Sequence, residues 1–170
     1  MITIAPHDPG WAPAFRPEAA DLHRLAPSFL VIEHIGSAAI PGLAAKPVID
    51  NLAAVNALDD LTPDLPALNQ RGYAVVDAGM QNRHFLQRPG FNLHAVTLDS
   101  WPRRKERLMR EALIADPKAA ARYGALKHQL ALTHGDDIAA YTKAKTAFVQ
   151  EIMDQVHGRL GWPRENVGED

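Results

Sequence analysis

The stretch "EHIGSAAIPGLAAKPVIDN", residues 33–51, decides how this chain folds. An apolar run ends at Gly36-Ser37, and the next apolar run carries Asp50. Glycine permits positive φ or close backbone approach, and such a turn leaves N–H groups pointing at one spot, to which Ser37 adds a hydroxyl. The stretch therefore indicates either an ordinary bend between two strands or a phosphate cradle with a carboxylate across from it.

The pattern on both sides of this stretch predicts an α+β fold. Apolar residues at helical spacing precede it, and short β-branched runs typical of strands follow it. The expected strands are residues 29–35, 47–55, 73–77, 84–88 and 92–98, and residues 101–160 have a helical pattern with breaks near 116–117 and 134–136. This order predicts a mixed β-sheet flanked by helices, with a helical C-terminal third. We expect one domain over residues 1–160 and a frayed C-terminal tail over 161–170.

Composition excludes several classes of protein. The 170 residues include no cysteine, which excludes a disulfide scaffold, a thiolate zinc site and a cysteine nucleophile, and fits a cytoplasmic protein. The net charge of -2 gives no general attraction to nucleic acid or anionic lipid, so an anion site must be local. No stretch approaches the roughly 18 apolar residues of a membrane span, and we predict no membrane partner.

Asp50 lies between Ile49 and Leu52 in a run that looks buried. A carboxylate there is costly unless it is paired or holds a cation, although a surface position or a hydrogen-bonded cap is the simpler interpretation. The turn itself is not a Walker loop, because Leu43 follows Gly42 where that motif requires lysine.

Three segments resemble the GrpB-like family: "IEHIGSAAIPGLAAKPVID", "YGALKHQLA" and "AYTKAKTAFV". The resemblance runs from about residue 11 to residue 156. It implies the nucleotidyltransferase fold superfamily, in which a Gly-Ser turn meets the nucleotide phosphates and strand carboxylates hold a divalent metal. Carried onto this chain, it assigns phosphate binding to Gly36 and Ser37, and a catalytic, metal-binding role to Asp50.

The chain departs from the superfamily pattern at Leu52. A second acid is expected there, two residues after Asp50 on the same face of the strand. A single carboxylate cannot build the two-metal clamp, with ions about 3.5–4 Å apart, that nucleotidyl transfer commonly uses. The resemblance suggests that His94, in "NLHAV", completes a catalytic site for Mg²⁺ or Mn²⁺, although a lone strand histidine is usually structural. Glu33 and His34 are further candidates, of which only one can face Asp50, and we favour His34.

The C-terminal helices offer cations for phosphate. Lys127 follows Tyr123 by four residues, and Lys145 follows Tyr141 by four, so each pair shares a helix face. A solvated lysine lying over a tyrosine is the simpler interpretation. Because both lysines lie in segments that carry the family resemblance, we predict that they bind phosphate.

The expected function is metal-dependent nucleotidyl or phosphoryl transfer with an undefined substrate. The alternative is a non-catalytic protein that binds a nucleotide or phosphometabolite and has a degenerate metal site, which Leu52 favours. The signatures of serine hydrolases, zinc metalloproteases and Rossmann folds are missing from the sequence. RNA as a partner has no support, because no basic stripe with interleaved aromatic residues occurs.

Overall fold

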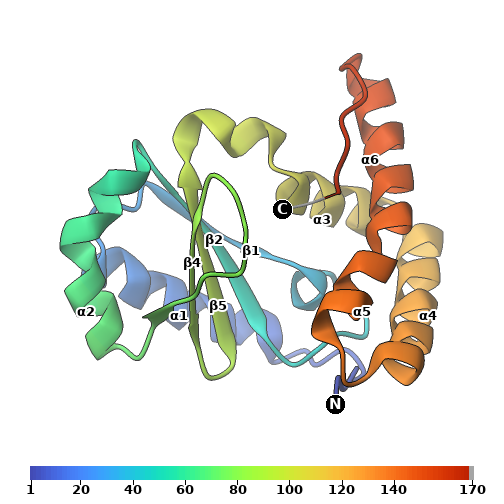
Figure 1. The fold of residues 1–170 in the computed structure, drawn as a ribbon, viewed down its shortest axis with the longest axis horizontal. Coiled ribbons are helices and arrows are strands. Elements are labelled where there is room, and N and C mark those ends of the chain that lie inside the picture. Colours follow the sequence, from blue (N-terminus) through green and yellow to red (C-terminus); the bar gives the residue numbers. More distant parts are fainter. Residues whose placement is uncertain (169–170) are drawn as a thin grey trace.

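The computed structural model describes residues 1–168, which fold into a five-stranded sheet with helices around it (Figure 1). Helix α1 (Trp11–Leu25) comes first, and β1 (Val31–Ile35) and β2 (Ile49–Val55) follow it. The middle of the chain forms α2 (Leu65–Gln70), β3 (Ala74–Val75), β4 (His84–Arg88) and β5 (Phe91–Thr97). The last part is helical, with α3 (Lys105–Ala115), α4 (Pro117–His134), α5 (Ile138–Ala144) and α6 (Thr146–Leu160).

The sheet is mixed, with strand order β1-β2-β5-β4-β3. Strands β2 and β5 are parallel, and the other neighbours are antiparallel. The register places Asp50 beside Asn92 and Leu52 beside His94. Paired residues on neighbouring strands point to the same face, so these four side chains share one face, which we call the site face. The predicted α+β class and mixed sheet are confirmed.

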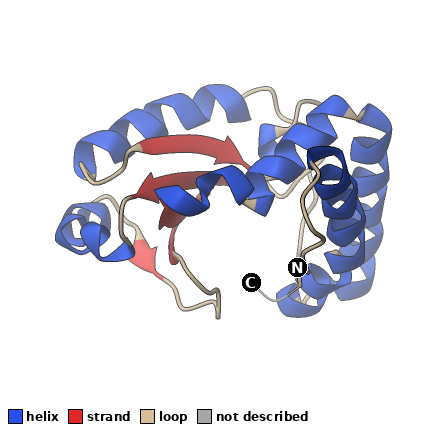
Figure 2. Ribbon diagram, turned by 90° about the horizontal axis from the view of Figure 1, so that it is seen from above, coloured by secondary structure: helices blue, strands red, loops and turns tan. Residues whose placement is uncertain are grey.

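The opposite face of the sheet holds the main hydrophobic core. Helices α1 and α2 cover it, as the view from above shows (Figure 2). Its buried residues come from the helices and from alternate positions on the strands, and they include Leu22, Leu61, Leu68, Ala53, Val55, Leu93 and Ala95. The alternation that buries these residues turns Asp50 and His94 the other way.

The helical C-terminal third has a core of its own. It joins α3, α4 and α6 with the loop after β1, through Leu113, Ala119, Phe148, Ile152, Val156, Ile40 and Leu43. The predicted breaks are present: Asp116 caps α4 by accepting hydrogen bonds from two backbone N–H groups, and Asp137 caps α5 by accepting one. A further break at Lys145, between α5 and α6, was not predicted.

The segment after α6 turns back along that helix. The Val167 N–H donates to Gln150 Oε1 at 2.9 Å, and Arg164 pairs with Asp154 at 3.2 Å. The tail predicted to be frayed includes residues 169–170, which lie outside the described residues, and the domain boundary stays a prediction. Within residues 1–168, no helix has the length and apolar character needed to cross a membrane.

Candidate functional site

The turn after β1 closes directly onto Asp50. Gly36 has φ +75° and ψ -177°, and a Cβ at this position would lie 2.6 Å from Asp50 Oδ2. Ile35, the last residue of β1, pairs with Asp50 across the sheet. Only glycine combines this backbone conformation with this close approach. The structure therefore brings the predicted turn and the predicted carboxylate together.

Asp50 is a partly buried carboxylate among cations. Its side chain is 25% exposed, and Oδ1 accepts a hydrogen bond from Asn92 Nδ2 at 2.7 Å. Burial is the largest influence and raises the pKa of Asp50, while Asn92, Lys46 and Lys145 act in the opposite direction. The lysines thus supply positive charge near a carboxylate whose ionised form is costly to bury.

His94 lies on the site face, next to Asp50. Its Nε2 is 4.0 Å from Asp50 Oδ1, its ring stacks on Phe85 with the ring centroids 4.7 Å apart, and its Nδ1 is 3.3 Å from Arg83 Nη1. Burial and the Arg83 charge lower the pKa of His94 to about 4. The imidazole is therefore neutral at neutral pH, and it forms no ion pair with Asp50.

These residues do not fit a two-ion metal centre. Leu52 is 0% exposed and packs with Ile35, Ala54, Val96 and Trp101. One oxygen of Asp50, Oδ1, already accepts a hydrogen bond from Asn92. Across residues 1–168, no group of three or more histidine, aspartate or glutamate side chains is placed to hold an ion. Magnesium or manganese at Asp50 and His94 stays a prediction.

The preference for His34 over Glu33 was wrong. His34 pairs in register with Asn51, on the face opposite Asp50, and its ring stacks on Phe15 of α1 with the centroids 5.1 Å apart. Glu33 shares the site face, but there it accepts hydrogen bonds from Arg107 and Arg110 of α3. Because Ile35 pairs with Asp50, alternation along β1 turns Glu33, and not His34, to the site face.

Three lysines, which we call the lysine cluster, come together near Asp50. Lys46 precedes β2, Lys127 belongs to α4, and Lys145 lies between α5 and α6. The Nζ atoms of Lys46 and Lys145 lie 5.5 Å and 4.5 Å from the centroid of the Tyr141 ring. The ammonium groups of Lys46 and Lys145, which are distant in the sequence, thus lie over the same aromatic ring.

Lys127 is the buried member of the lysine cluster. It is 3% exposed, its Nζ donates to the Ala44 carbonyl, and it lies 4.9 Å from the centroid of the Tyr123 ring. Burial, together with the charges of Lys145 and Lys46, lowers its pKa to about 7. Burial and Lys46 lower the pKa of Lys145 to about 8, although Asp50 opposes this shift. The cluster therefore carries positive charge that an anion would stabilise.

Lys127 has a testable effect on stability. Its folded-state pKa, about 7, lies below its ordinary value of 10.5, so between these pH values the unfolded chain binds more protons. We therefore expect the free energy of unfolding in phosphate-free buffer to rise with pH above about 7. Lys127→Met should flatten this rise, which urea unfolding between pH 7 and 9 would measure. An equal slope in both proteins would contradict the assignment.

Tyr123 connects the lysine cluster to the turn. It interacts with Ser37, and it lies close enough to Asp50 and Tyr141 for their charges to affect it. Burial is the main cause that raises its pKa to about 12, so its hydroxyl stays protonated. The site thus gathers Ser37, Asp50 and three lysines around two tyrosines. All the predicted site residues lie in this region or, for His94, beside Asp50.

Sequence reasoning missed two members of this site. Lys46 is exposed and lies in a loop, so no periodicity marks it, although it stands four residues before Asp50. Asn92 lies two residues before His94 on the same strand face, a spacing that would have found it. Asn92 is beside Asp50 because β2 and β5 run side by side, whereas Lys46 belongs to the loop that leads into β2.

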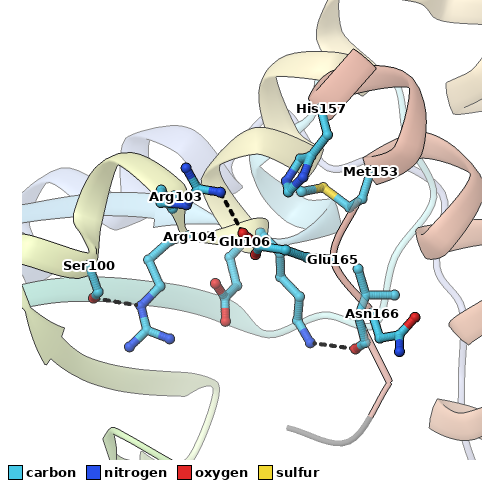
Figure 3. Close-up of a pocket in the computed structure, with 10 residues that line it drawn as sticks. Ser100, Arg103, Arg104, Glu106, Met153, His157, Glu165 and Asn166 are labelled. Carbon is cyan, nitrogen blue, oxygen red and sulfur yellow. Dashed lines mark hydrogen bonds and ion pairs between the residues drawn. The ribbon is translucent and has the colours of Figure 1, made fainter. Parts of the chain in front are cut away.

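A cavity of about 280 Å³ lies beside α3 and α6 (Figure 3). Its lining includes Ser100, Arg103, Arg104, Glu106 and Glu165, and none of the lysine cluster. A chain of polar contacts leads from it to the site: Glu106 accepts from Arg83 at 2.6 Å, and Arg83 contacts His94. Side-chain contacts therefore link the lining of the cavity to His94, which lies beside Asp50, whereas no member of the lysine cluster lines the cavity.

Comparison with known proteins identifies the family. The sequence profile described as GrpB protein matches residues 1–155. This chain belongs to the GrpB family. The UPF0157 protein YqkA of Bacillus subtilis is 30% identical over 155 residues, which are 88% of this chain but 45% of that relative. The chain therefore matches less than half of the length of that relative.

Solved structures agree with the family and extend the likeness of the fold. The crystal structure of GrpB from Enterococcus faecalis has a TM-score of 0.84 at 30% identity, covering 94% of this GrpB-family chain and 99% of that one. Terminal uridylyl transferase 4 from Trypanosoma brucei, solved with bound dUTP, has a TM-score of 0.55 at 12% identity. That match covers 93% of this chain and 56% of the transferase, and it shows a nucleotidyltransferase-like fold.

Proposed function

We propose that this protein binds a nucleotide or another phosphorylated small molecule at the lysine cluster, beside the Gly36-Ser37 turn. The observation that carries the proposal is the convergence of Lys46, Lys127 and Lys145. Burying and crowding ammonium groups is unfavourable without an anion, as the lowered pKa values of Lys127 and Lys145 indicate. A phosphate group would relieve that cost with several charge-assisted hydrogen bonds.

The surroundings of the lysine cluster add polar groups for a phosphorylated ligand. Tyr123 and Tyr141 lie under the lysines, and their rings are already covered, because Tyr141 is 1% exposed and Tyr123 stacks on Phe148. Ser37 and the turn at Gly36 add polar groups on the sheet side. The uridylyl transferase solved with bound dUTP shares the fold. Nucleoside triphosphates are therefore the first ligands to test, with inorganic triphosphate as the minimal anion.

Lys145→Met tests the proposal against a matched control. We expect it to weaken binding of inorganic triphosphate and UTP about tenfold or more, because a hydrogen bond to a charged group contributes about 1.5–3 kcal/mol. Lys143→Met, at an exposed lysine in the last turn of α5, should leave the affinity within about twofold. Isothermal titration calorimetry measures both. Equal effects of the two variants, or no binding by the parent protein, would contradict the proposal.

Transfer of a nucleotidyl or phosphoryl group is the second candidate, favoured by the fold and by the position of Asp50 on β2. In this reading His94 and Asp50 act on a ligand that the lysines hold. The buried Leu52 makes the two-ion version unfavourable. Consumption of UTP or ATP across a panel of acceptors, with wild type and His94→Ala, separates transfer from binding. A wild-type rate that His94→Ala abolishes would support the enzyme.

A further inference from the structure

We propose that this site takes its phosphorylated ligand as the free anion, with lysine ammonium groups in the place that a divalent metal occupies in metal-dependent transfer. The inference rests on the proposed function and defines the charge state of the ligand. Three features carry it: the lysines near Asp50, the close contacts of the Asp50 carboxylate with Asn92 and Gly36, and the lack of further metal ligands in the described residues.

The cations come from the chain itself. Lys145 interacts electrostatically with Asp50 and also with Lys46 and Lys127. A metal held by the strand carboxylate would supply positive charge to the phosphate, and Lys145 supplies positive charge near that same carboxylate. A divalent ion placed beside Asp50 would also be repelled by these ammonium groups. The electrostatics therefore favour an anion over a cation.

The Asp50 carboxylate is poorly available to a metal. Asn92 donates to Oδ1 at 2.7 Å, and the Gly36 backbone closes on Oδ2. The nearby imidazole of His94 could coordinate a metal only through nitrogen, and Mg²⁺ prefers oxygen ligands.

Leu52 removes the second ligand position. Its side chain is fully buried beside Trp101, where a metal-binding acid would otherwise project from β2. Among residues 1–168, no cluster of three metal-binding side chains compensates for this loss. The site thus has the lysine cluster for a phosphate group, and it has apolar packing at the position where a second metal-binding acid is expected.

The first test uses Mn²⁺ alone, with free manganese measured by electron paramagnetic resonance. We expect the wild-type protein to bind Mn²⁺ with a dissociation constant above about 1 mM, which is the weak limit of biological Ca²⁺ sites. Asp50→Asn should not change this dissociation constant. Asn92→Asp, which sets a second carboxylate beside Asp50, is the positive control and should raise Mn²⁺ affinity. Tighter wild-type binding that Asp50→Asn abolishes would overturn the inference.

The second test titrates inorganic triphosphate and UTP into the protein in EDTA and in Mg²⁺. We expect EDTA to leave the affinity unchanged or to improve it, because Mg²⁺ competes with the lysines for phosphate oxygens. Binding that weakens about tenfold when EDTA replaces Mg²⁺ would overturn the inference and leave the proposed function standing. No binding of either probe in both buffers would overturn the proposed function, and this inference with it.

Discussion

Replacing Glu18 by alanine is expected to lower the free energy of unfolding by about 3–5 kcal/mol, the cost of breaking a buried charge network. The Glu18 side chain is 2% exposed, and it accepts hydrogen bonds from Arg71, from the Tyr73 hydroxyl at 2.7 Å and from Arg88. These contacts join α1 to the end of α2 and to β4. Without Glu18, Arg88 and the Tyr73 hydroxyl lose their carboxylate partner beside the main core, whereas Arg71 keeps its ion pair with Asp21 at 3.1 Å.

Urea unfolding at neutral pH measures this loss, and Glu151→Ala provides the control. Glu151 also accepts two hydrogen bonds from an arginine, Arg122, but that pair lies at the surface and its removal should change stability little. A similar loss in the two variants would contradict the prediction.

The same network gives stability an acid dependence. Burial opposes ionisation of Glu18, yet its hydrogen bonds with Arg88 and Tyr73 hold its pKa below the ordinary value of 4.5. A carboxylate with a lowered folded-state pKa stabilises the fold fully above its unfolded pKa. This contribution is lost as the pH falls below about 4.5, and Glu18→Gln should remove that part of the acid sensitivity.

Gly36→Ala is expected to cost about 1–3 kcal/mol and to abolish phosphate binding, because it strains the backbone in a region that side chains avoid. The added methyl would lie 2.6 Å from Asp50 Oδ2, so the turn or the carboxylate must move. The measurements are urea unfolding and calorimetric titration with triphosphate. Both the backbone conformation and the contact oppose the change, so no side-chain rotation relieves it.

Gly158→Ala is the matched control for this substitution. Gly158 lies inside α6, and a Cβ there would meet no atom within 4 Å. Alanine in a helix interior is more favourable than glycine by about 0.5–1 kcal/mol, so this variant should be slightly more stable than the parent protein and bind triphosphate normally. A Gly36→Ala protein that keeps both stability and binding would show that the turn tolerates a side chain.

Much of the fold could be predicted because it depends on local patterns. Short β-branched runs place the strands, and helical spacing with breaks at Asp116 and near Gly135 divides the C-terminal third. Strand β3 is shorter than its apolar run suggested, because only Ala74 and Val75 pair with β4. The break at Lys145 carries no glycine or proline, and local rules gave no signal for it.

The candidate site was predictable only where neighbouring strands bring its parts together. Gly36 and Asp50 are close because β1 and β2 are consecutive in the chain and paired in the sheet, as expected for two short runs separated by a turn. His34 was assigned to the wrong face because alternation needs a reference residue. The reference is the pairing of Ile35 with Asp50, which the sequence does not reveal.

The sequence by itself determined most of the strands and helices, the glycine turn and the family, since each depends on residues close together in the chain. Only the tertiary structure decided that Lys46, Lys127 and Lys145 meet, and that Asn92 occupies one oxygen of Asp50. The physical reason is that a periodic pattern specifies which face of an element is buried, but not the angle and register at which two elements pack. The charge around Asp50 therefore follows from how α4 and α5 pack beside the sheet.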